Sequence, residues 1–398
     1  MPGPARDAGA PQRAAARAPR PGLSELVREW GRIGCIGFGG PPAHIALLRE
    51  LCVTRRGWLS EHEFEDAIAA TNLLPGPAST QLAIYCAWRL RGIAGTLVGG
   101  LSFIVPGLIL ILALAALFLA SSPPHWVLGA GAGSGAAVAA VALQAAASLA
   151  PASWRRTAAA PRWVLYSLAG AISAATMGAW LVLVLLSCGA IEVTLRRARP
   201  NHGTAGIHAW PLLATAAAAT GGLLALSWVA FKVGALSYGG GFVIIPLMQH
   251  DAVDTYHWMT DGQFLNAVAL GQVTPGPVVH TVAVVGYAAA GLGGGLLAAT
   301  VAFAPSFSFV LIGAERFDRL RANPTVRTFL GGAGPAAIGA IAGAAIPLAL
   351  ALTETWQFAV LASAALALFA LRRGVVITLI GAGAVGAVAS ALGAPLPR

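Results

Sequence analysis

Long apolar segments separated by short polar ones make up most of the chain, at about residues 93–119, 126–149, 163–194, 209–230, 292–313, 329–352, 355–371 and 374–392. Each is long enough, or nearly so, to cross a hydrocarbon core of about 30 Å as a helix. Segment 163–194 is long for one crossing, and a turn at Met177-Gly178 would divide it into two short helices. An open sheet would leave backbone groups unbonded in lipid, and no segment alternates like a barrel strand. The pattern therefore predicts an all-α polytopic membrane protein with about 10–13 membrane segments.

Composition and charge support this prediction. Asp, Glu, Lys and Arg make up 10% of the 398 residues and hydrophobic residues make up 57%, whereas charged residues are about 25% of a typical soluble protein. The net charge is +10, and the arginines gather in short clusters between apolar segments. Such clusters are typical of the cytoplasmic flanks of membrane helices. The expected surroundings are a lipid bilayer, and nucleic acid is not an expected partner.

The sequence matches itself when it is shifted by 200 residues. Pro75-Gly76-Pro77 falls on Pro275-Gly276-Pro277, and Trp58 falls on Trp258. Apolar composition alone would align Ala, Leu and Val, but not Trp and PGP in the same register, so the chain is an internal duplication. Its expected parts are a disordered basic cytoplasmic tail at 1–22, a first membrane repeat at 23–195, a linker at 196–208 and a second membrane repeat at 209–398.

The two repeats differ in the charge of a matched loop. The first repeat carries Arg49, Arg55 and Arg56 there, whereas residues 249–265 contain three Asp and no Lys or Arg. Two further arginines fall on uncharged residues of the second repeat, Arg89 on Ala289 and Arg91 on Gly291. Because positively charged loops stay in the cytoplasm, we expect an inverted repeat, the architecture of many secondary transporters. The alternative is two parallel repeats whose loops have drifted in charge.

Glycine and proline interrupt two elements in each repeat. The first interruption is the cluster Gly37, Gly39, Gly40, Pro41 and Pro42, matched by Gly239, Gly240 and Gly241, and the second is the PGP motif. Proline removes an N–H donor, and glycine permits bends and close backbone approach. Half-helices that begin after such breaks point N–H groups and a positive dipole end at one place, which suits an anion. We therefore expect broken, re-entrant helices whose PGP motifs meet near the middle of the membrane; the alternative is kinks that only permit tight packing.

Polar residues cluster around these breaks and can donate hydrogen bonds to an oxyanion. The predicted substrate-binding residues are Gly39, Gly40, His44, Asn72, Pro75, Gly76, Pro77, Thr80 and Gln81 in the first repeat, and Gly239, Gly240, Gln272, Pro275, Gly276, Pro277 and His280 in the second. Arg32 and Lys232 are matched bases that we predict to line an entry or exit funnel. The alternatives are hydrogen bonds between helices for the polar residues and snorkelling to headgroups for the bases.

Metal and enzyme chemistry find little support in the sequence. The eight histidines include no HxxH or HxxxH pair, and the four cysteines include no CxxC pair. No Ser-His-Asp or HExxH arrangement can be assembled, so we expect no metal, no cofactor and no enzyme activity. An intramembrane enzyme acting on a lipid phosphate remains an alternative, and it would need a positioned base or metal cluster.

The paired motifs resemble a known family. "FGGPPAHI" and "LLPGPASTQLAIY" in the first repeat, with "YGGGFVIIPLM" and "TPGPVVHTVAVVGY" in the second, resemble the chromate ion transporter family in its long, two-domain form, over about residues 24–392. The resemblance implies efflux of chromate, a tetrahedral dianion shaped like sulfate, across the bacterial inner membrane, and hence chromate resistance. Sulfate or another oxyanion is the alternative substrate. The oligomeric state is open, with a homodimer among the expected assemblies.

The charge of such a substrate predicts the direction of transport. A dianion that leaves a cytoplasm with a negative potential moves downhill by about 4.6 kcal/mol per 100 mV, twice the value of about 2.3 kcal/mol for one charge. Few acids lie inside the apolar segments, where a coupled importer usually carries a buried carboxylate. We therefore expect export that is driven largely by the membrane potential, with exchange or proton coupling compatible but not required.

Overall fold

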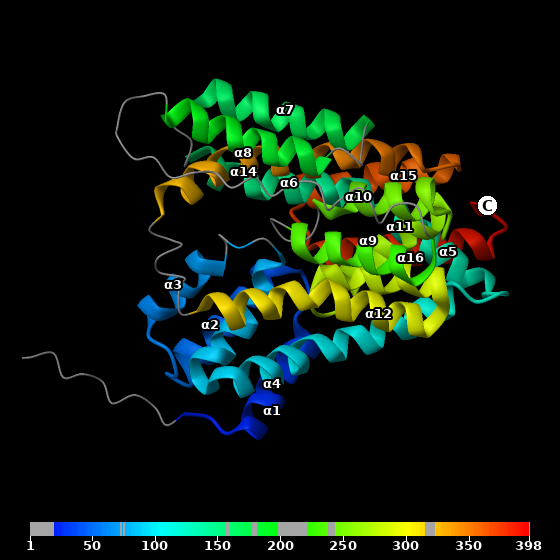
Figure 1. Cartoon of the computed structure of the whole chain (residues 1–398). Helices are drawn as coiled ribbons and strands as arrows, with labels where there is room; N and C mark the ends of the chain where they lie inside the picture. The colour runs from blue at the N-terminus through cyan, green and yellow to red at the C-terminus, as the bar shows by residue number, and fades with distance from the viewer. Residues whose placement is uncertain are drawn as a thin grey trace, which may run out of the picture.

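A computed structural model of the chain describes residues 20–71, 74, 76–155, 159–176, 181–197, 221–237, 243–314 and 323–397. All regular elements within these residues are helices, and most of them run roughly along one common direction (Figure 1). The predicted all-α fold is therefore confirmed. The predicted tail at 1–22 lies almost wholly outside the described residues, as do most of the linker at 196–208 and the turn at Met177-Gly178.

The same series of elements occurs twice. The first repeat contains α1 (Leu23–Ile36), α2 (Pro41–Arg49), the π-helix η1 (Glu50–Arg55), α3 (Glu61–Thr71), α4 (Ala78–Phe118), α5 (His125–Ala136), α6 (Val138–Arg155), α7 (Ala160–Thr176) and α8 (Leu181–Arg197). The second contains α9 (Gly222–Leu236), α10 (Ile244–Gln249), the π-helix η3 (His250–Thr255), α11 (Asp261–Val273), the short η4 (Val278–His280), α12 (Thr281–Gly313), α14 (Pro324–Leu350), α15 (Thr355–Ala365), η6 (Leu366–Ala370) and α16 (Val375–Ala391). The expected division of 163–194 into two helices is confirmed by α7 and α8.

Equivalent breaks support the duplication at the level of the backbone. The π-helices η1 and η3 are 200 residues apart. Both long helices contain a kink, at Gly92 with φ 59° in α4 and at Gly291 with φ 60° in α12, which are 199 residues apart. The second repeat is therefore one residue shorter between its PGP motif and its kink. This corrects the sequence alignment there, because Gly92, and not Arg91, is the counterpart of Gly291.

Ion pairs show that the first repeat folds as two helical hairpins. Arg56, after η1, pairs with Glu25 at 3.2 Å and Glu29 at 2.8 Å, so the chain returns to the beginning of α1. Arg89 pairs with Glu63 at 2.7 Å, so the first part of α4 returns to the beginning of α3. The glycine cluster and the first PGP motif are the tips of these two hairpins. At the kink α4 reverses again, and its remainder runs as a long apolar helix.

Four of the described helical segments are long and apolar enough to cross a membrane: Ala78–Phe118, His125–Arg155, Val278–Gly313 and Pro324–Leu350. Helix α14 packs against α6, α7 and α8, and α16 packs against α5, with glycines at many of the closest approaches. Small residues allow such backbone contact between membrane helices. Large apolar side chains such as Leu165, Ile172 and Ile377 are more than 60% exposed, as expected for surfaces that face lipid.

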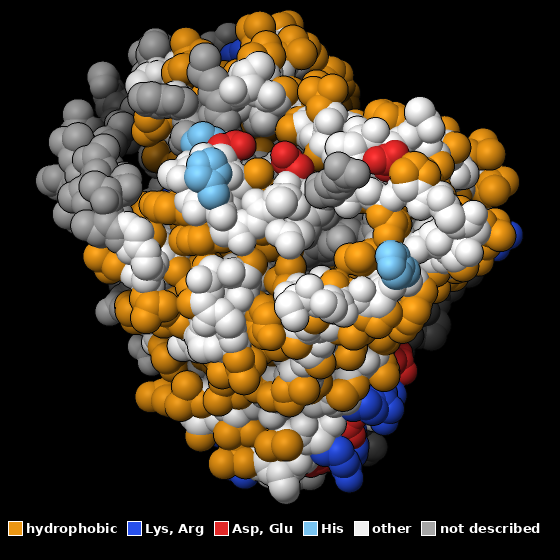
Figure 2. Space-filling model, turned by 90° about the vertical axis from the view of Figure 1, so that its right-hand side faces the viewer, with side chains coloured by type: hydrophobic (Ala, Val, Ile, Leu, Met, Phe, Trp, Pro, Cys, Tyr) orange, Lys and Arg blue, Asp and Glu red, His pale blue; other side chains and the backbone are white. Residues whose placement is uncertain are grey.

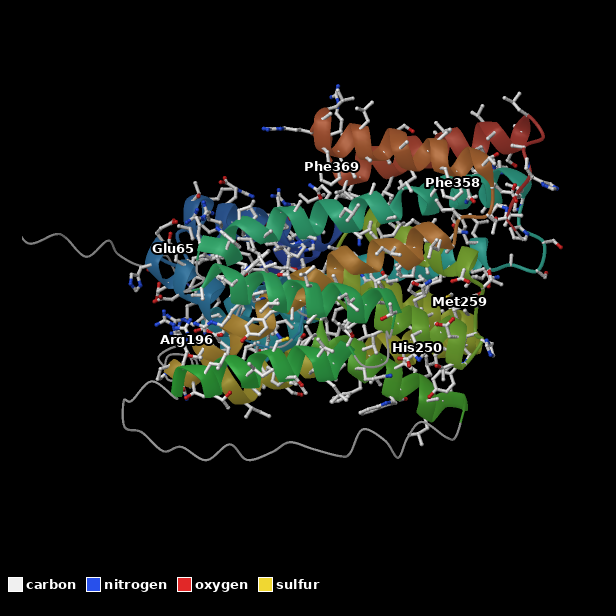
Figure 3. The ribbon with its side chains drawn as sticks, turned by 90° about the horizontal axis from the view of Figure 1, so that it is seen from above. Glu65, Arg196, His250, Met259, Phe358 and Phe369 are labelled. Carbon is white, nitrogen blue, oxygen red and sulfur yellow. The ribbon has the colours of Figure 1, made fainter. Side chains whose placement is uncertain are left out.

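Matched loops lie at opposite ends of the molecule. Helices α2 and α3 are at one end of the long helices and α10 and α11 at the other (Figure 1). From above, Glu65 and Arg196 lie at one end, and His250 and Met259 lie at the opposite end (Figure 3). The end that carries α11 shows acidic and histidine side chains, with Lys and Arg mainly near its edges (Figure 2). The charge difference in the sequence therefore corresponds to two separate ends of the fold.

Candidate anion-binding site

The hairpin tips of the two repeats contact each other across the molecule. The Gly276 N–H of the second PGP motif donates a 3.0 Å hydrogen bond to the Gly37 carbonyl of the first glycine cluster. The Pro275 carbonyl of the same motif faces Gly107 in α4 at a distance that leaves no room for a Cβ. In the other direction, a Cβ at Gly76 would lie 3.3 Å from the Gly234 carbonyl of α9. Each PGP motif therefore packs against helices of the other repeat.

Two helices begin at these tips with uncapped N-termini. Helix α2 begins after Gly40 and α4 after Pro77, and neither N-cap residue makes a side-chain hydrogen bond. Gly39 and Gly40 have φ values of 97° and 72°, which L-residues with a side chain rarely adopt. The first N–H groups of a helix lack partners within the helix. Because Pro41 and Pro42 have no N–H, α2 contributes only the Ala43 N–H, whereas the first turn of α4 contributes the N–H groups of Ala78, Ser79 and Thr80.

The PGP glycines face two different polar side chains. Gly76 has φ 116°, and a Cβ there would lie 2.5 Å from Gln81 Nε2. Gly276 has φ 95°, and a Cβ there would lie 3.1 Å from His280 Cε1. Gln81 and His280 are 199 residues apart, so they are structural counterparts. The predicted site residues therefore form two adjacent pairs, Gly76 with Gln81 and Gly276 with His280, although the alignment with a shift of 200 had matched Gln81 with Thr281.

The two predicted histidines have different surroundings. His44 is fully buried, its Nε2 is 2.8 Å from the Gly37 carbonyl and its Nδ1 is 3.2 Å from Ser79 Oγ. His280 is also fully buried, but neither ring nitrogen has a hydrogen-bond partner among the described residues. Each ring packs edge-on against a phenylalanine, His44 against Phe103 at 5.0 Å and His280 against Phe303 at 5.2 Å. His44 thus fixes the tip, whereas His280 has unused hydrogen-bonding capacity.

Further buried polar atoms near the tips have no partner among the described residues. They include Thr80 Oγ1 and Gln272 Nε2, both from the predicted set, and the hydroxyls of Ser237 and Ser306. A polar group buried without a hydrogen bond costs about 1–3 kcal/mol, so each of these groups is expected to bond a water, an ion or a ligand. Sequence reasoning missed the two serines. Ser237 caps the C-terminus of α9 two residues before the second glycine cluster, and Ser306 follows Pro305, the counterpart of Pro106, so both positions could have been found from the repeat.

Some predicted site residues lie outside the described residues, namely Asn72, Pro75, Gly239 and Gly240. The two predicted funnel bases are described and differ from each other. Lys232 Nζ lies 2.6 Å from Asp251 Oδ2, so its charge is paired, whereas Arg32 is exposed. Their role in guiding anions stays a prediction, which Arg32 fits better than Lys232.

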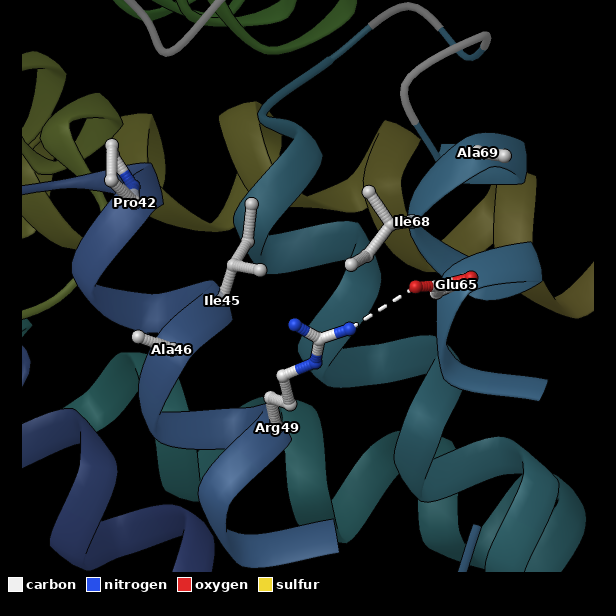
Figure 4. Close-up of a pocket in the computed structure, with 7 residues that line it drawn as sticks. All are labelled: Pro42, Ile45, Ala46, Arg49, Glu65, Ile68 and Ala69. Atoms are coloured by element: carbon white, nitrogen blue, oxygen red, sulfur yellow. Dashed lines mark hydrogen bonds and ion pairs between the residues drawn. The ribbon is translucent and has the colours of Figure 1, made fainter. Parts of the chain in front are cut away.

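A cavity of about 400 Å³ lies between α2 and α3, at the arginine-rich end of the molecule (Figure 4). It extends from Arg49 and Glu65, whose side chains are 3.2 Å apart, to Pro42 beside the first glycine cluster. A second cavity of about 260 Å³ lies beside α11 at the opposite end, and Asn266 and Leu396 are among its lining residues. The two cavities thus lie at opposite ends of the fold, and the first reaches a hairpin tip at Pro42.

Within the part of the chain that the structure describes, no group of three or more His, Cys, Asp or Glu side chains could hold a metal ion. The four cysteines are free thiols, and three of them are buried. The chemistry that converges at the tips is therefore hydrogen-bond donation from backbone amides, hydroxyls, an amide and an imidazole. That set suits recognition of an oxyanion.

The chain matches the family model described as "Chromate transporter" over residues 24–193 and 224–387. It is 33% identical to the chromate transport protein of Cupriavidus metallidurans, over 83% of this chain and 84% of that protein. It is 31% identical to the probable chromate transport protein of Synechococcus elongatus, over 82% and 84% of the two chains. It is 29% identical to the chromate transport protein of Pseudomonas aeruginosa, over 83% and 82%. No solved structure matches the chain.

The family match falls in two segments that coincide with the two structural repeats. These relatives are named as transport proteins, and the fold supplies apolar helices and hairpin tips of the kind that a membrane transporter needs. The chain therefore belongs to the chromate transporter family.

Proposed function

We propose that this protein exports chromate across the bacterial inner membrane as a multi-pass transporter. The carrying observation is the set of buried, unpartnered polar groups at the interlocked hairpin tips, among them Thr80, Gln272 and His280. A transporter must replace the hydration shell of its ion with protein groups, and these buried groups have hydrogen-bonding capacity that no described residue satisfies. The uncapped N-terminus of α4 adds backbone donors, and the N-termini of both α2 and α4 add a positive dipole end. A tetrahedral oxyanion matches this set in charge and hydrogen bonding.

The repeats are inverted in this proposal, and the hairpins are re-entrant. Support comes from the matched loops, which lie at opposite ends of the fold, and from the arginines, which belong mainly to one of them (Figure 3). The arginine-rich end with Arg49 is then cytoplasmic. The cavity between α2 and α3 opens from the cytoplasm, and the cavity beside α11 opens on the outer side. The ion site lies between them.

Export follows from charge. Outward movement of net negative charge is favoured by a negative interior, by about 2.3 kcal/mol per charge at 100 mV. Since each tenfold gradient corresponds to about 1.4 kcal/mol, one net charge at 100 mV sustains more than a tenfold chromate gradient, and two charges sustain one above about 10³. Collapsing the potential with valinomycin and potassium, while the pH gradient is kept, should therefore strongly reduce chromate flux. Undiminished flux would contradict a mechanism driven by the potential.

The test of function is uptake of radiolabelled chromate into inverted membrane vesicles from cells that make the protein. We expect potential-dependent accumulation that vesicles without the protein lack. Sulfate is the second candidate substrate, because neutral donors recognise the shared tetrahedral shape and charge. Excess unlabelled sulfate that fails to compete would indicate chromate selectivity. If labelled sulfate accumulates and chromate does not, the substrate assignment is wrong.

A further inference from the structure

His280 differs from the other unpartnered groups at the tips because it always presents an acceptor. A hydroxyl can rotate to donate its proton, and the Gln272 amide nitrogen is a donor. A neutral imidazole has one N–H, so in either tautomer its other nitrogen carries a lone pair. The carbonyl of Ile104 in α4 lies beside the ring but outside hydrogen-bond geometry. Even if it accepted the N–H, the bare nitrogen would remain.

The groups packed around His280 offer no other proton. Gly107 of α4, Gly276 of the PGP motif and Phe303 of α12 contact the ring. No carboxylate among the described residues acts on it, and the titratable group whose charge reaches it is His44. Both His44 nitrogens already face Gly37 and Ser79. Within the described part of the chain, the buried lone pair of His280 therefore has no hydrogen-bond donor.

A fully deprotonated oxyanion carries acceptors alone. Placed against the bare nitrogen of His280, which is buried from solvent, it would bring two lone pairs together, which is unfavourable. One proton between them removes the conflict, either as imidazolium that donates to the anion or as a hydrogen oxyanion that donates to the imidazole. The two descriptions differ only in the position of the proton within one hydrogen bond.

We propose that one proton accompanies each chromate ion through the site, held between the anion and the His280 imidazole. The inference rests on the proposed function. The proton binds with the anion from the cytoplasmic side and leaves with it, so the transported unit carries one net negative charge instead of two. Gln81 occupies the equivalent place in the first repeat and cannot take up a proton, so a single proton is expected.

The experiment measures the charge that moves with each chromate ion. The purified protein is reconstituted in liposomes, valinomycin sets the potential, and the potential of zero net chromate flux is determined. With one net charge, a tenfold chromate gradient is balanced by about 59 mV, and with two charges by about 30 mV. With one proton per ion, each unit of pH difference shifts the balance point by about 59 mV as well. We expect the larger slope and the pH shift for the wild-type protein.

The variant His280→Gln copies the side chain of the first repeat. We expect it to move chromate with two net charges, a balance point of about 30 mV per tenfold gradient and no pH shift. The matched control is His62→Gln in α3, whose side chain is 85% exposed beside Asp66, and it should behave as the wild type. Proton uptake on chromate binding, measured by titration calorimetry in alkaline buffers of different ionisation enthalpy, gives an independent readout in detergent. We expect about one proton per anion for the wild type.

The outcomes separate the two proposals. Absence of chromate flux in the wild type would count against the proposed function. Wild-type flux with two net charges and no proton uptake would leave that function standing and overturn this inference. If His280→Gln keeps the wild-type slope and pH shift, the proton is not held at His280. If His280→Gln does not transport, the number of protons per chromate ion is decided by the balance potential and the proton uptake of the wild type. Loss of proton uptake on chromate binding to the variant then shows that the proton is held at His280.

Discussion

At the residue scale, the glycine of each PGP motif is required both by the backbone conformation and by a close side-chain neighbour. Gly76 and Gly276 have φ values of 116° and 95°, and both lie against a polar side chain of the site. The requirement for an unusual backbone conformation could be predicted from the sequence, because Pro-Gly-Pro restricts the backbone wherever it occurs. The neighbouring side chains could not be predicted, because Gln81 and His280 come to face these glycines only in the folded chain.

Replacing either PGP glycine by leucine should abolish chromate transport while the protein still reaches the membrane. The side chain would occupy the place of the anion and collide with Gln81 or His280, and the backbone strain is of order 1–3 kcal/mol. The control is Gly57→Leu, at φ 57° in a loop where a Cβ would meet nothing within 4 Å. Chromate flux in vesicles, normalised to protein level, is the measurement. Wild-type rates in Gly76→Leu and Gly276→Leu would contradict a backbone cradle.

We expect the Thr80 hydroxyl to support transport and to lower the stability of the folded protein. It is fully buried and has no partner among the described residues, so Thr80→Val removes a desolvated polar group. We expect transport to fall at least tenfold, about 1.4 kcal/mol, and the melting temperature in detergent to stay equal or rise. Thr96→Val is the control, since the Thr96 hydroxyl donates to the Gly92 carbonyl. A variant Thr80→Val that melts earlier and transports normally would show a structural role instead.

At the scale of elements, the hairpin is the unit that carries the site. Its tips were predictable because Gly and Pro act on their own backbone. The interlocking of tips from different repeats was not predictable, because it depends on contacts such as Gly276 with Gly37 that no local pattern encodes. The single-residue change of offset before Gly291 also escaped the alignment, since Ala and Val fit either register. The predicted 126–149 segment became α5 and α6, which meet at Ala137.

Helix α4 positions the second PGP motif by leaving space at Gly107. A larger side chain there would collide with the Pro275 carbonyl and the His280 ring. We expect Gly107→Leu to destabilise the protein by about 1–3 kcal/mol through overpacking and to lower transport further than Gly293→Leu. Gly293 is in α12, and a Cβ there meets nothing within 4 Å. Thermal melting in detergent and vesicle flux check this; equal effects of the two variants would rule out a specific role for the Gly107 contact.

At the scale of the whole molecule, we expect the charge difference between the two ends to set the orientation in the membrane. Arg55 and Thr255 are exposed counterparts at opposite ends. In a protein with Cys35→Ser, which removes the exposed native thiol, we expect Thr255→Cys to react with an impermeant maleimide on intact cells. Arg55→Cys should react only after the cells are opened. Equal labelling of both in intact cells would exclude the inverted topology.

The exchange of contacts between the tips has a consequence for how such a protein can be assembled. A half that is synthesised alone lacks the carbonyl or glycine that its PGP motif requires, so the two halves should restore chromate resistance only when they are produced together as separate polypeptides. Two copies of the same half could pair in the way that the two repeats do, but they would supply two glutamines or two imidazoles in place of one of each. Fusion of the two halves into one chain ensures that each molecule contains one glutamine and one imidazole at these equivalent positions.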